Sequence, residues 1–458
     1  MNEFNNQYEI AQNCYTGEID GYGYAFVPGS SFGVVLLDFQ TKRLLDNISV
    51  SDGSLNQERI NLLLEKRLIR RQNDPVRPLV LNQAAVKSID TWLHVANCCN
   101  LSCPYCYIAD KQPNEFMSLL IADSYLDKLE ETVSSHGLKL VSVRFAGGEP
   151  TLNKKIVYHV IGEIKRRFID KGIAVKTTLI TNGTNLNSGW LKLMRSNSMG
   201  LCVSLDGIGS WHDRSRFFKD GKGSFEVVIR NIDFCREQGV NPTILTTVTE
   251  ENLGGLPSLF GFLVDNNFSF RLGVYRDNVG GYRGYVDFIN RLKDVLRRCY
   301  AYYVDSIRNN GKIFSHRFSD IQLDRKPHLR CCGVGYSSVV VDHRGQVFLC
   351  QAGMDKPSIG TIHDNRTLLE MAWSQKTFPE LQDKTVFDYD DCRECQWALV
   401  CGGGCHTVKK NAWDSVTKAS PYCDLFKFVI PKIIELKALY LISNLKKGGG
   451  NGIGNPDS

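Results

Sequence analysis

Three cysteines near residue 100 have a spacing that suits an iron–sulfur cluster. Cys99, Cys103 and Cys106 form a Cys-x3-Cys-x2-Cys array. A cubane [4Fe–4S] cluster is held by four thiolates, so three closely spaced cysteines leave one iron without a protein ligand. An open iron can chelate a small molecule and transfer an electron to it. The alternatives are scattered core thiols or a zinc site, and zinc would need Cys98 or His94 as its fourth ligand.

A glycine-rich run, Ala146-Gly-Gly-Glu-Pro-Thr151, follows the predicted strand 141–145. Glycine lets the backbone approach a ligand closely because it has no Cβ. Active sites of barrel folds lie at the carboxyl ends of the strands. Alone, the run fits an ordinary turn. Its place at a strand end, about 40 residues after the cysteine triplet, favours a ligand contact.

Two further polar runs end predicted strands. They are Thr181-Asn-Gly-Thr184 and Val203-Ser-Leu-Asp-Gly207, the second followed by His212-Asp-Arg214. If the strands form a barrel, short polar side chains at these strand ends can reach the ribose or the carboxylate of a ligand bound at the mouth of the barrel. The alternative is a strand-end turn with a helix cap.

The triplet and these three runs together resemble the motifs of radical S-adenosylmethionine (SAM) enzymes. The resemblance implies that the open iron binds the amino and carboxylate groups of SAM, and that reduction yields a 5′-deoxyadenosyl radical. It also implies that the Gly-Gly-Glu run binds the methionine amino group, and that the aromatic residue before the third cysteine lies against the adenine. The implied SAM contacts are Tyr105, Gly147, Gly148, Glu149, Asn182, Ser204 and Asp206.

The C-terminal part of the chain has a second cysteine pattern. Cys332-x12-Gly-x4-Cys350 precedes Cys392-x2-Cys395-x5-Cys401-x3-Cys405, and Cys423 closes the set. The pattern resembles the seven-cysteine SPASM domain, which in its family binds two auxiliary [4Fe–4S] clusters. With the triplet, the resemblance implies three clusters.

The resemblance also implies which cysteines share a cluster. The distal cluster would be held by Cys392, Cys395, Cys401 and Cys423, and the proximal one by Cys332, Cys350 and Cys405. Cys331 fits the first position nearly as well as Cys332. The resemblance does not identify a fourth ligand for the proximal cluster. The fourth iron of that cluster either has no protein ligand or binds Cys331. Structural zinc is the alternative for the whole pattern, since Cys-x2-Cys pairs often bind zinc.

Composition limits the remaining possibilities. Sixteen cysteines in a chain without a signal-like start favour metal binding over disulfides and predict a cytoplasmic protein. No apolar run approaches the length of a membrane span. A net charge of +6 over 458 residues is modest, so neither a nucleic acid nor a membrane is expected as a partner. Four cysteines without such spacing, Cys14, Cys202, Cys235 and Cys299, are predicted to be buried hydrophobes.

Strand and helix patterns alternate through the middle of the chain, which predicts an α/β fold: a partial (β/α)6 TIM-like barrel. The predicted strands are 91–95, 141–145, 175–180, 200–205, 243–248 and 269–274. The predicted helices are 119–134, 155–171, 188–195, 225–238, 256–265 and 285–309. The predicted domains are a module at 1–80, the radical SAM barrel at 88–310, a SPASM domain at 325–445, where the regular pattern stops, and a disordered Gly-rich tail at 446–458.

The N-terminal module reads as a strand hairpin followed by two helices. Strands 22–27 and 32–37 flank a turn, and helices are predicted at 41–48 and 56–70. This resembles the winged-helix peptide-recognition domain of peptide maturases. There a leader peptide adds a strand to the sheet edge and packs against a helix. The alternative is that the module only caps the barrel.

The family resemblance implies an enzyme that modifies a ribosomally made peptide. The radical would remove a hydrogen atom from a side chain or backbone carbon, a cross-link would follow, and the auxiliary clusters would accept an electron. The partners would be a precursor peptide with leader and core, and a flavodoxin or ferredoxin as electron donor.

One residue bears on the choice of substrate. Sulfatase maturases of this family carry an aspartate base after the cysteine equivalent to Cys350. Here that residue is Gln351, which cannot accept a proton in the same way. Cross-linking is therefore favoured over formylglycine formation, and no catalytic base is assigned. The alternatives are a maturase of sulfatases or quinone-cofactor proteins and, from another class, a non-catalytic zinc-scaffolded binding module.

Overall fold

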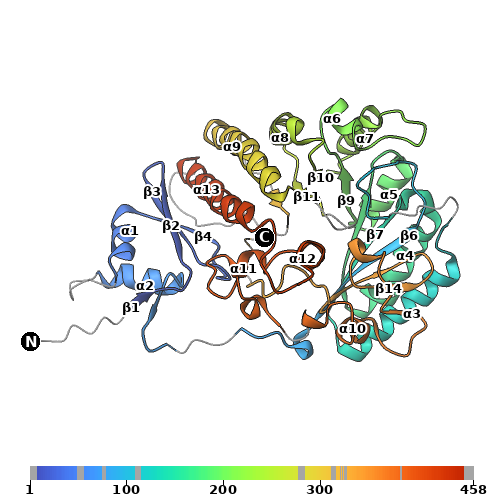
Figure 1. Cartoon of the computed structure of the whole chain (residues 1–458), viewed down its shortest axis with the longest axis horizontal. Helices are drawn as coiled ribbons and strands as arrows, with labels where there is room; N and C mark the ends of the chain where they lie inside the picture. The colour runs from blue at the N-terminus through green and yellow to red at the C-terminus, as the bar shows by residue number, and fades with distance from the viewer. Residues whose placement is uncertain are drawn as a thin grey trace, which may run out of the picture.

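The N-terminal module, the parallel sheet and the C-terminal helices are distinct parts of the molecule in the computed structural model (Figure 1). The module lies at one end, the strands β6 and β7 with their helices lie at the other, and α11, α12 and α13 lie between them. The structure describes residues 8–48, 56–74, 79–108, 115–276, 284–310, 316–319, 321, 323, 327–381 and 384–447. The predicted tail after residue 447 lies outside these ranges.

The N-terminal module contains two small antiparallel sheets. The predicted hairpin is present as β3 (Tyr22–Phe26) and β4 (Val34–Leu37), and β2 (Tyr15–Ile19) adds a strand in the order β2-β3-β4. A second sheet pairs β1 (Tyr8–Ile10) with β5 (Ile69–Arg71). Helices α1 (Phe39–Asp46) and α2 (Gln57–Glu65) complete the module. It has a hydrophobic cluster of its own, which includes Ala25, Leu37, Leu45, Ile60 and Leu63.

The second predicted helix, 56–70, is shorter than its sequence pattern suggested. It ends at Glu65, and Arg67 adopts a φ of +56°, which a helix cannot contain. The chain then turns into β5. Leu68 stays buried, as its place in the apolar pattern predicted, although it lies beyond the helix.

The six predicted barrel strands are all present and all parallel, in sequential order within one sheet. They are β6 (Ser88–Ala96), β7 (Leu140–Gly147), β8 (Ala174–Thr181), β9 (Gly200–Ser204), β10 (Thr243–Val248) and β11 (Phe270–Val274). The helices that follow them are α3 (Leu119–His136), α4 (Lys154–Arg167), α5 (Ser188–Ser196), α6 (Ser210–Asp213), α7 (Phe225–Glu237), α8 (Leu256–Asp265) and α9 (Tyr285–Asn310).

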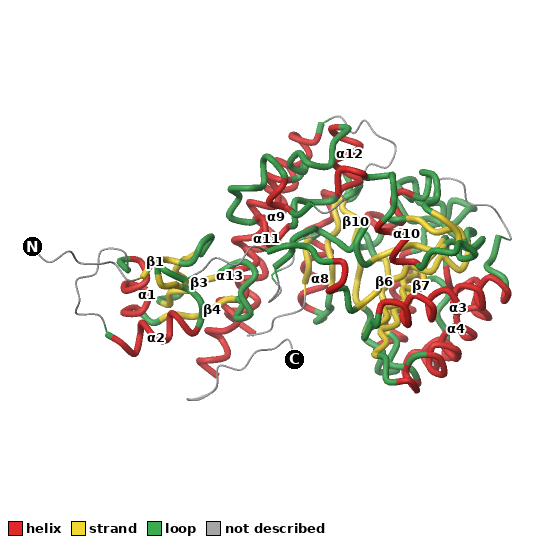
Figure 2. The backbone as a smooth tube through the Cα atoms, turned by 90° about the horizontal axis from the view of Figure 1, so that it is seen from below, coloured by secondary structure: helices red, strands yellow, loops and turns green. Residues whose placement is uncertain are grey.

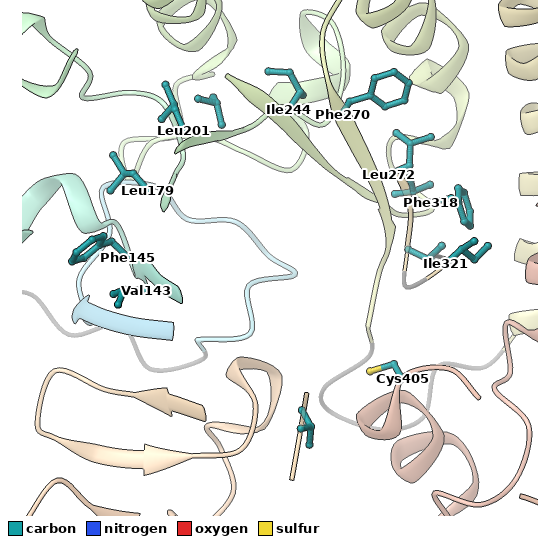
Figure 3. Packing of buried hydrophobic residues seen from close by; sticks show 14 of the residues in the cluster. Val143, Phe145, Leu179, Leu201, Ile244, Phe270, Leu272, Phe318, Ile321 and Cys405 are labelled. Carbon is teal, nitrogen blue, oxygen red and sulfur yellow. The ribbon is translucent and has the colours of Figure 1, made fainter. Parts of the chain in front are cut away.

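Alternate residues of these strands build the core. Val143 and Phe145 of β7, and Phe270 and Leu272 of β11, are fully buried and belong to one large cluster (Figure 3). Residues two apart in a strand point to the same face, so each strand presents one apolar row to its covering helices. This packing fixes the positions of the strand ends, where the polar runs lie.

The sheet extends beyond the six strands on both sides. β12 (His316–Phe318) pairs with β11, and β13 (Ser338–Val341) pairs in parallel with β6. β14 (Gln346–Phe348) and β15 (Gly360–Thr361) follow antiparallel, which gives the order β12-β11-β10-β9-β8-β7-β6-β13-β14-β15. These added strands were not among the predicted ones. β13 is only four residues long, and its partner lies about 250 positions earlier, so the local sequence gives little sign of it.

Four helices follow in the cysteine-rich part. They are α10 (Leu368–Trp373), α11 (Ala398–Cys401), α12 (His406–Trp413) and α13 (Cys423–Lys447). Helix α13 contacts both α9 and the sheet of the N-terminal module (Figures 1 and 2). No helix within the described part of the chain combines the length and apolar character needed to span a membrane.

Candidate SAM and iron–sulfur site

A cavity of about 280 Å³ lies at the carboxyl ends of the barrel strands. All three cysteines of the triplet line it, and so do the predicted SAM contacts with the exception of Asp206. The predicted residues in its wall are Cys99, Cys103, Tyr105, Cys106, Gly147, Gly148, Glu149, Asn182 and Ser204. The structure therefore gathers residues from four segments of the sequence around one space.

The two glycines after β7 hold the cysteine loop against the sheet. The amide of Gly148 donates to the carbonyl of Ala96 at 2.8 Å, and the amide of Glu149 donates to the carbonyl of Cys98 at 2.9 Å. A Cβ on Gly148 would lie 2.0 Å from the Cys98 oxygen, and one on Gly147, whose φ is +135°, would lie 2.3 Å from the Ala96 oxygen. Only glycine fits at either position. Because the main chain of Cys98 is tied to β7, the adjacent Cys99 reaches the cavity.

Glu149 is a buried carboxylate with three neighbouring residues as donors. It accepts hydrogen bonds from the Thr151 hydroxyl at 2.7 Å, the Thr181 hydroxyl at 2.6 Å and the Asn182 amide at 2.8 Å. Burial raises the pKa of Glu149, and these hydrogen bonds oppose the rise. The bonds also fix the position of the carboxylate, which is suited to pair with an ammonium group in the cavity.

Asn182 lies beside the first cysteine of the triplet. Its Nδ2 is 3.7 Å from the Cys99 Sγ and donates to the Asn100 side chain at 2.8 Å, while its Oδ1 accepts from the Thr184 amide at 2.9 Å. The amide of Leu101 also points at the Cys99 sulfur, at 3.4 Å. Hydrogen bonds to a ligand sulfur tune an iron–sulfur cluster, so Asn182 is placed to act on Cys99 as well as on a ligand.

Asp206 lies behind the cavity wall, contrary to its expected place as a SAM contact. Its side chain is fully buried. It accepts hydrogen bonds from the Tyr105 hydroxyl, from the Arg216 Nε at 2.7 Å and from the Thr247 amide at 2.8 Å. The Arg216 guanidinium also lies 5.5 Å from the centroid of the Tyr105 ring. The carboxylate therefore holds two residues that line the cavity, Tyr105 and Arg216.

Three arginines that were not among the predicted site residues also line the cavity. Arg216 follows the β9 run, and Arg271 and Arg276 lie on and just after β11. Their charge suits a carboxylate-bearing ligand. The His212-Asp-Arg214 run, which ends two residues before Arg216, is the sequence signal that could have identified this arginine.

The His212-Asp213 pair itself has a structural role. His212 Nδ1 accepts from the Asp206 amide at 3.2 Å, and its Nε2 lies 3.0 Å from the Ser224 hydroxyl. Asp213 accepts from the amide of Phe225, the first residue of α7, at 2.8 Å. The pair holds the loop from which Arg216 reaches the cavity.

The cysteine-rich part completes the cavity wall. Gln351 and Ala352, directly after Cys350, line the same space as the SAM-contact residues. The residue that sets this chain apart from the sulfatase-maturase pattern is thus at the site.

The remaining cysteines fall into two groups. The thiols of Cys392, Cys395, Cys401 and Cys423 interact electrostatically with one another. Burial raises the pKa of Cys401 to about 12 and that of Cys392 to about 11, so metal binding must displace protons there. These are the four cysteines that the family resemblance assigns to the distal cluster.

The second group contains Cys350, which interacts electrostatically with Cys405 and Cys332. The loop after Cys401 contacts the segment before Cys332: a Cβ on Gly402 would lie 2.3 Å from the backbone nitrogen of Cys331. The thiols of Cys331 and Cys332 and a ring nitrogen of His406 all lie within 4.8 Å of one another, which suits a metal site.

A buried lysine favours negative charge on both groups of cysteines. Lys409 is fully buried, and its Nζ has no hydrogen-bond partner among the described residues. It interacts electrostatically with Cys331 and Cys405 on one side and with Cys392 and Cys401 on the other. A buried cation needs a compensating anion, and thiolate-bound iron–sulfur clusters supply negative charge. The residues present therefore fit clusters in both groups.

The four isolated cysteines differ in burial. Cys235 and Cys299 are buried, as expected, whereas Cys14 and Cys202 are only partly so. Burial raises the pKa of Cys14 and of Cys235 to about 11 and that of Cys299 to about 12, so these thiols are protonated at neutral pH.

The parallel barrel, its cysteine triplet and the cysteine-rich extension define a radical SAM protein. The sequence matches the Radical SAM superfamily over residues 93–262 and the SPASM iron-sulfur cluster-binding domain over residues 331–396. The chain is thus a radical SAM enzyme with a SPASM domain, and its cofactors are SAM and iron–sulfur clusters. The predictions of the family, the fold class and an enzyme are confirmed.

Several known proteins resemble it. A cysteine-type anaerobic sulfatase-maturating enzyme of Clostridium novyi is 27% identical over 367 residues, which are 76% of this chain and 95% of the relative. The structure of native anSMEcpe with bound AdoMet and Cp18Cys peptide has a TM-score of 0.62 at 21% identity, covering 78% of this chain and 99% of that one. The structure of Streptococcus suis SuiB bound to precursor peptide SuiA has a TM-score of 0.53 at 14% identity, covering 90% and 98%.

Proposed function

We propose that this enzyme modifies a ribosomally made precursor peptide and forms a cross-link in its core. A reduced triplet cluster and bound SAM would supply a 5′-deoxyadenosyl radical, which would take a hydrogen atom from a carbon of the peptide. Closing the cross-link would release the second hydrogen as a proton to solvent and pass one electron to an auxiliary cluster. Three [4Fe–4S] clusters would be held by Cys99, Cys103, Cys106, Cys332, Cys350, Cys392, Cys395, Cys401, Cys405 and Cys423. A cytoplasmic flavodoxin or ferredoxin would supply the electron.

The cavity residues have separable tasks in this proposal. Glu149 binds the amino group of SAM, because its carboxylate is fixed by donors from three residues and lines the cavity. Arg216 binds the carboxylate of SAM, and Tyr105 presents its ring to the adenine. Ser204 and Asn182 face the same space and would bind the remaining polar groups. Together they orient SAM and exclude water from the reacting carbon.

The observation that carries the proposal is the open edge of the N-terminal sheet. Within the described residues the backbone of β4 pairs only with β3, and α13 packs against the same strand. We infer that a peptide pairs along the β4 edge that has no strand partner. Exposed apolar side chains lie in the same module, at Phe32 just before β4 and at Leu62 on α2. Strand addition supplies main-chain hydrogen bonds, and apolar contacts beside the strand supply specificity. A leader bound here would raise the local concentration of the core peptide at the barrel.

A second candidate is maturation of a sulfatase-type peptide, because the relatives include sulfatase-maturating enzymes. Gln351 favours the cross-linking candidate. It occupies the cavity wall at the position where the sulfatase maturases of the family carry an aspartate base, and a neutral amide cannot take up the proton.

The leader proposal can be tested with single substitutions in the module. The proposal implies a short precursor peptide encoded by a neighbouring open reading frame, and that peptide, carrying a fluorescent label, is the probe. Phe32→Asp and Leu62→Asp should each weaken its binding about tenfold or more, whereas SAM cleavage without peptide stays unchanged. Ile169→Asp is the matched control, because Ile169 is an exposed apolar residue far from the module in sequence.

Unchanged peptide binding in both variants would contradict the leader proposal. Deletion of residues 1–80 is a harsher version of the test, and the contact between α13 and this module means that the deletion also uncovers α13. The point variants are therefore the primary measurement. Mass spectrometry of the product before and after treatment with an aldehyde reagent such as hydroxylamine then distinguishes the two candidates. A cross-link and formylglycine made from serine both lose two hydrogens, but only formylglycine reacts with the reagent.

A further inference from the structure

We propose that His406 is the fourth ligand of the proximal auxiliary cluster, bound through its Nδ1 atom alongside Cys332, Cys350 and Cys405. This inference rests on the cluster content given under the proposed function. It assigns a ligand to an iron that the cysteine spacing alone leaves without one.

The two groups differ in the number of cysteines that the seven-cysteine pattern gives them. One group contains four mutually interacting cysteines, enough for a cubane cluster. The other group contains the remaining three cysteines of the seven-cysteine pattern, Cys350, Cys405 and Cys332, with Cys331 beside Cys332. A fourth ligand must come from a residue that the seven-cysteine pattern does not include.

The His406 ring lies beside the thiols of Cys331 and Cys332. The imidazole is buried, with 2% of the residue exposed. Its Nδ1 faces sulfur, 4.0 Å from the Cys331 Sγ, and its ring and the thiols of Cys331 and Cys332 form a compact set of possible metal ligands. His406 also directly follows Cys405, so the same turn of chain brings both residues to the site.

The other ring nitrogen of His406 contacts a tyrosine. The Nε2 of His406 lies 3.3 Å from the hydroxyl of Tyr389, which is itself buried. A histidine that binds metal usually engages its second ring nitrogen in a hydrogen bond, which fixes the orientation of the ring. Tyr389 therefore aims Nδ1 toward the thiols.

Cys331 is the competing fourth ligand. Its thiol lies 3.6 Å from the Cys332 thiol and is also buried. The backbone of Cys331 packs closely against Gly402: a Cβ atom added to Gly402 would lie 2.3 Å from the Cys331 nitrogen. We assign the ligand to His406 because its contact with Tyr389 orients its ring. Cys331 is then one of the residues that surround the cluster.

A histidine ligand has a consequence for electron transfer. Imidazole is neutral where a thiolate is negative, so the cluster carries less negative charge and is easier to reduce. Replacement of cysteine by histidine raises the potential of iron–sulfur centres in this way. A proximal cluster of this kind is suited to accept the electron released when the substrate radical is oxidised.

The test uses the full chain with Cys99, Cys103 and Cys106 changed to alanine, so that only the auxiliary clusters remain. After reconstitution and reduction, pulsed EPR on protein with natural and with ¹⁵N-labelled histidine should show a nitrogen coupling that changes with the label. His406→Ala should abolish the coupling. His406→Cys, the variant that keeps a ligand, should retain the iron but lose the coupling and lower the potential.

Two controls separate ligation from general damage. His136→Ala should leave the coupling intact, since His136 contacts Thr367 and Trp373 rather than cysteines. Cys331→Ser should also leave both the coupling and the iron content intact. The inference is overturned if the parent shows no histidine coupling, if the coupling survives in His406→Ala, or if only Cys331→Ser removes proximal iron.

These outcomes are independent of peptide modification. A histidine-coupled cluster in an enzyme that leaves the precursor peptide unchanged would refute the proposed substrate and keep the ligand. An enzyme that cross-links the peptide but shows no histidine coupling would support the proposed substrate and refute the histidine ligand. Metal analysis that finds zinc in place of iron would overturn the cluster content on which the ligand assignment rests.

Discussion

The ammonium group of Lys409 lies 4.1 Å from the centroid of the Tyr389 ring. This cation–π contact accounts for part of the cost of burying the charge, but the two groups of thiols on either side are the natural source of a compensating anion. The same tyrosine contacts His406, so one aromatic ring links the buried cation to the inferred histidine ligand.

Removal of this cation should lower the reduction potentials of the auxiliary clusters. A reduced cluster carries one more negative charge than its oxidised form, so a nearby cation favours reduction. In Lys409→Met we expect a decrease of about 70 mV, the effect of a unit charge about 10 Å away at an effective dielectric constant of about 20. Redox titration followed by EPR measures it. Lys410→Met is the control, because Lys410 lies next along α12 but pairs with Asp414 at the surface. Equal potentials in the two variants would contradict the role of Lys409.

The metal content follows from the ten predicted cysteine ligands. Reconstituted protein should contain roughly twelve irons and little zinc, since each cubane holds four. Changing Cys99, Cys103 and Cys106 together to alanine should remove about four irons and all SAM cleavage, while the auxiliary iron stays. Iron assay and quantification of 5′-deoxyadenosine measure the two effects. SAM cleavage that persists in the triple variant would refute the assignment of the triplet.

Local patterns in the sequence predicted the barrel well, and contacts between distant segments account for what was missed. Each barrel strand is an apolar run between polar turns, and the cysteine spacing is a local signal. The pairing of β13 with β6 joins residues far apart in the chain and has no such signal. Arg216 could be placed at the site only once Asp206 was known to lie behind it. Likewise, nothing in the apolar pattern of 56–70 marked the positive φ of Arg67 that ends α2.

The close approach at Gly148 gives a sharp test of how the cysteine loop is held. In Gly148→Ala the new Cβ would meet the Cys98 carbonyl oxygen at 2.0 Å, and neither backbone can yield easily. We expect loss of the triplet cluster and of SAM binding, with the auxiliary iron retained. Gly162→Ala is the control: Gly162 lies inside α4, and a Cβ there meets nothing within 4 Å. That change should stabilise the protein by about 0.5–1 kcal/mol, through helix propensity. A normal triplet cluster in Gly148→Ala would show that the loop adapts.

Gln351 predicts what the enzyme does not do. Incubated with SAM, a reductant and a sulfatase-type peptide, the parent enzyme should form no formylglycine, because the side chain at this position cannot act as a base. Mass spectrometry detects the product directly. Uncoupled SAM cleavage in the same samples verifies that the enzyme is active. Efficient conversion would favour the sulfatase candidate and show that another group accepts the proton.

The last prediction concerns Asp206, whose side chain lies behind the cavity wall. Asp206→Asn keeps the shape of the side chain but removes the charge that pairs with Arg216 at 2.7 Å. Because a buried guanidinium loses its partner, we expect lower thermal stability and at least tenfold weaker SAM binding, by calorimetry, through misplacement of Arg216 and Tyr105. Asp123→Asn is the matched control, since its partner His159 lies on the outer surface of the barrel helices and the pair is partly exposed. If Asp206→Asn bound SAM normally, Arg216 and Tyr105 would not depend on this carboxylate for their positions.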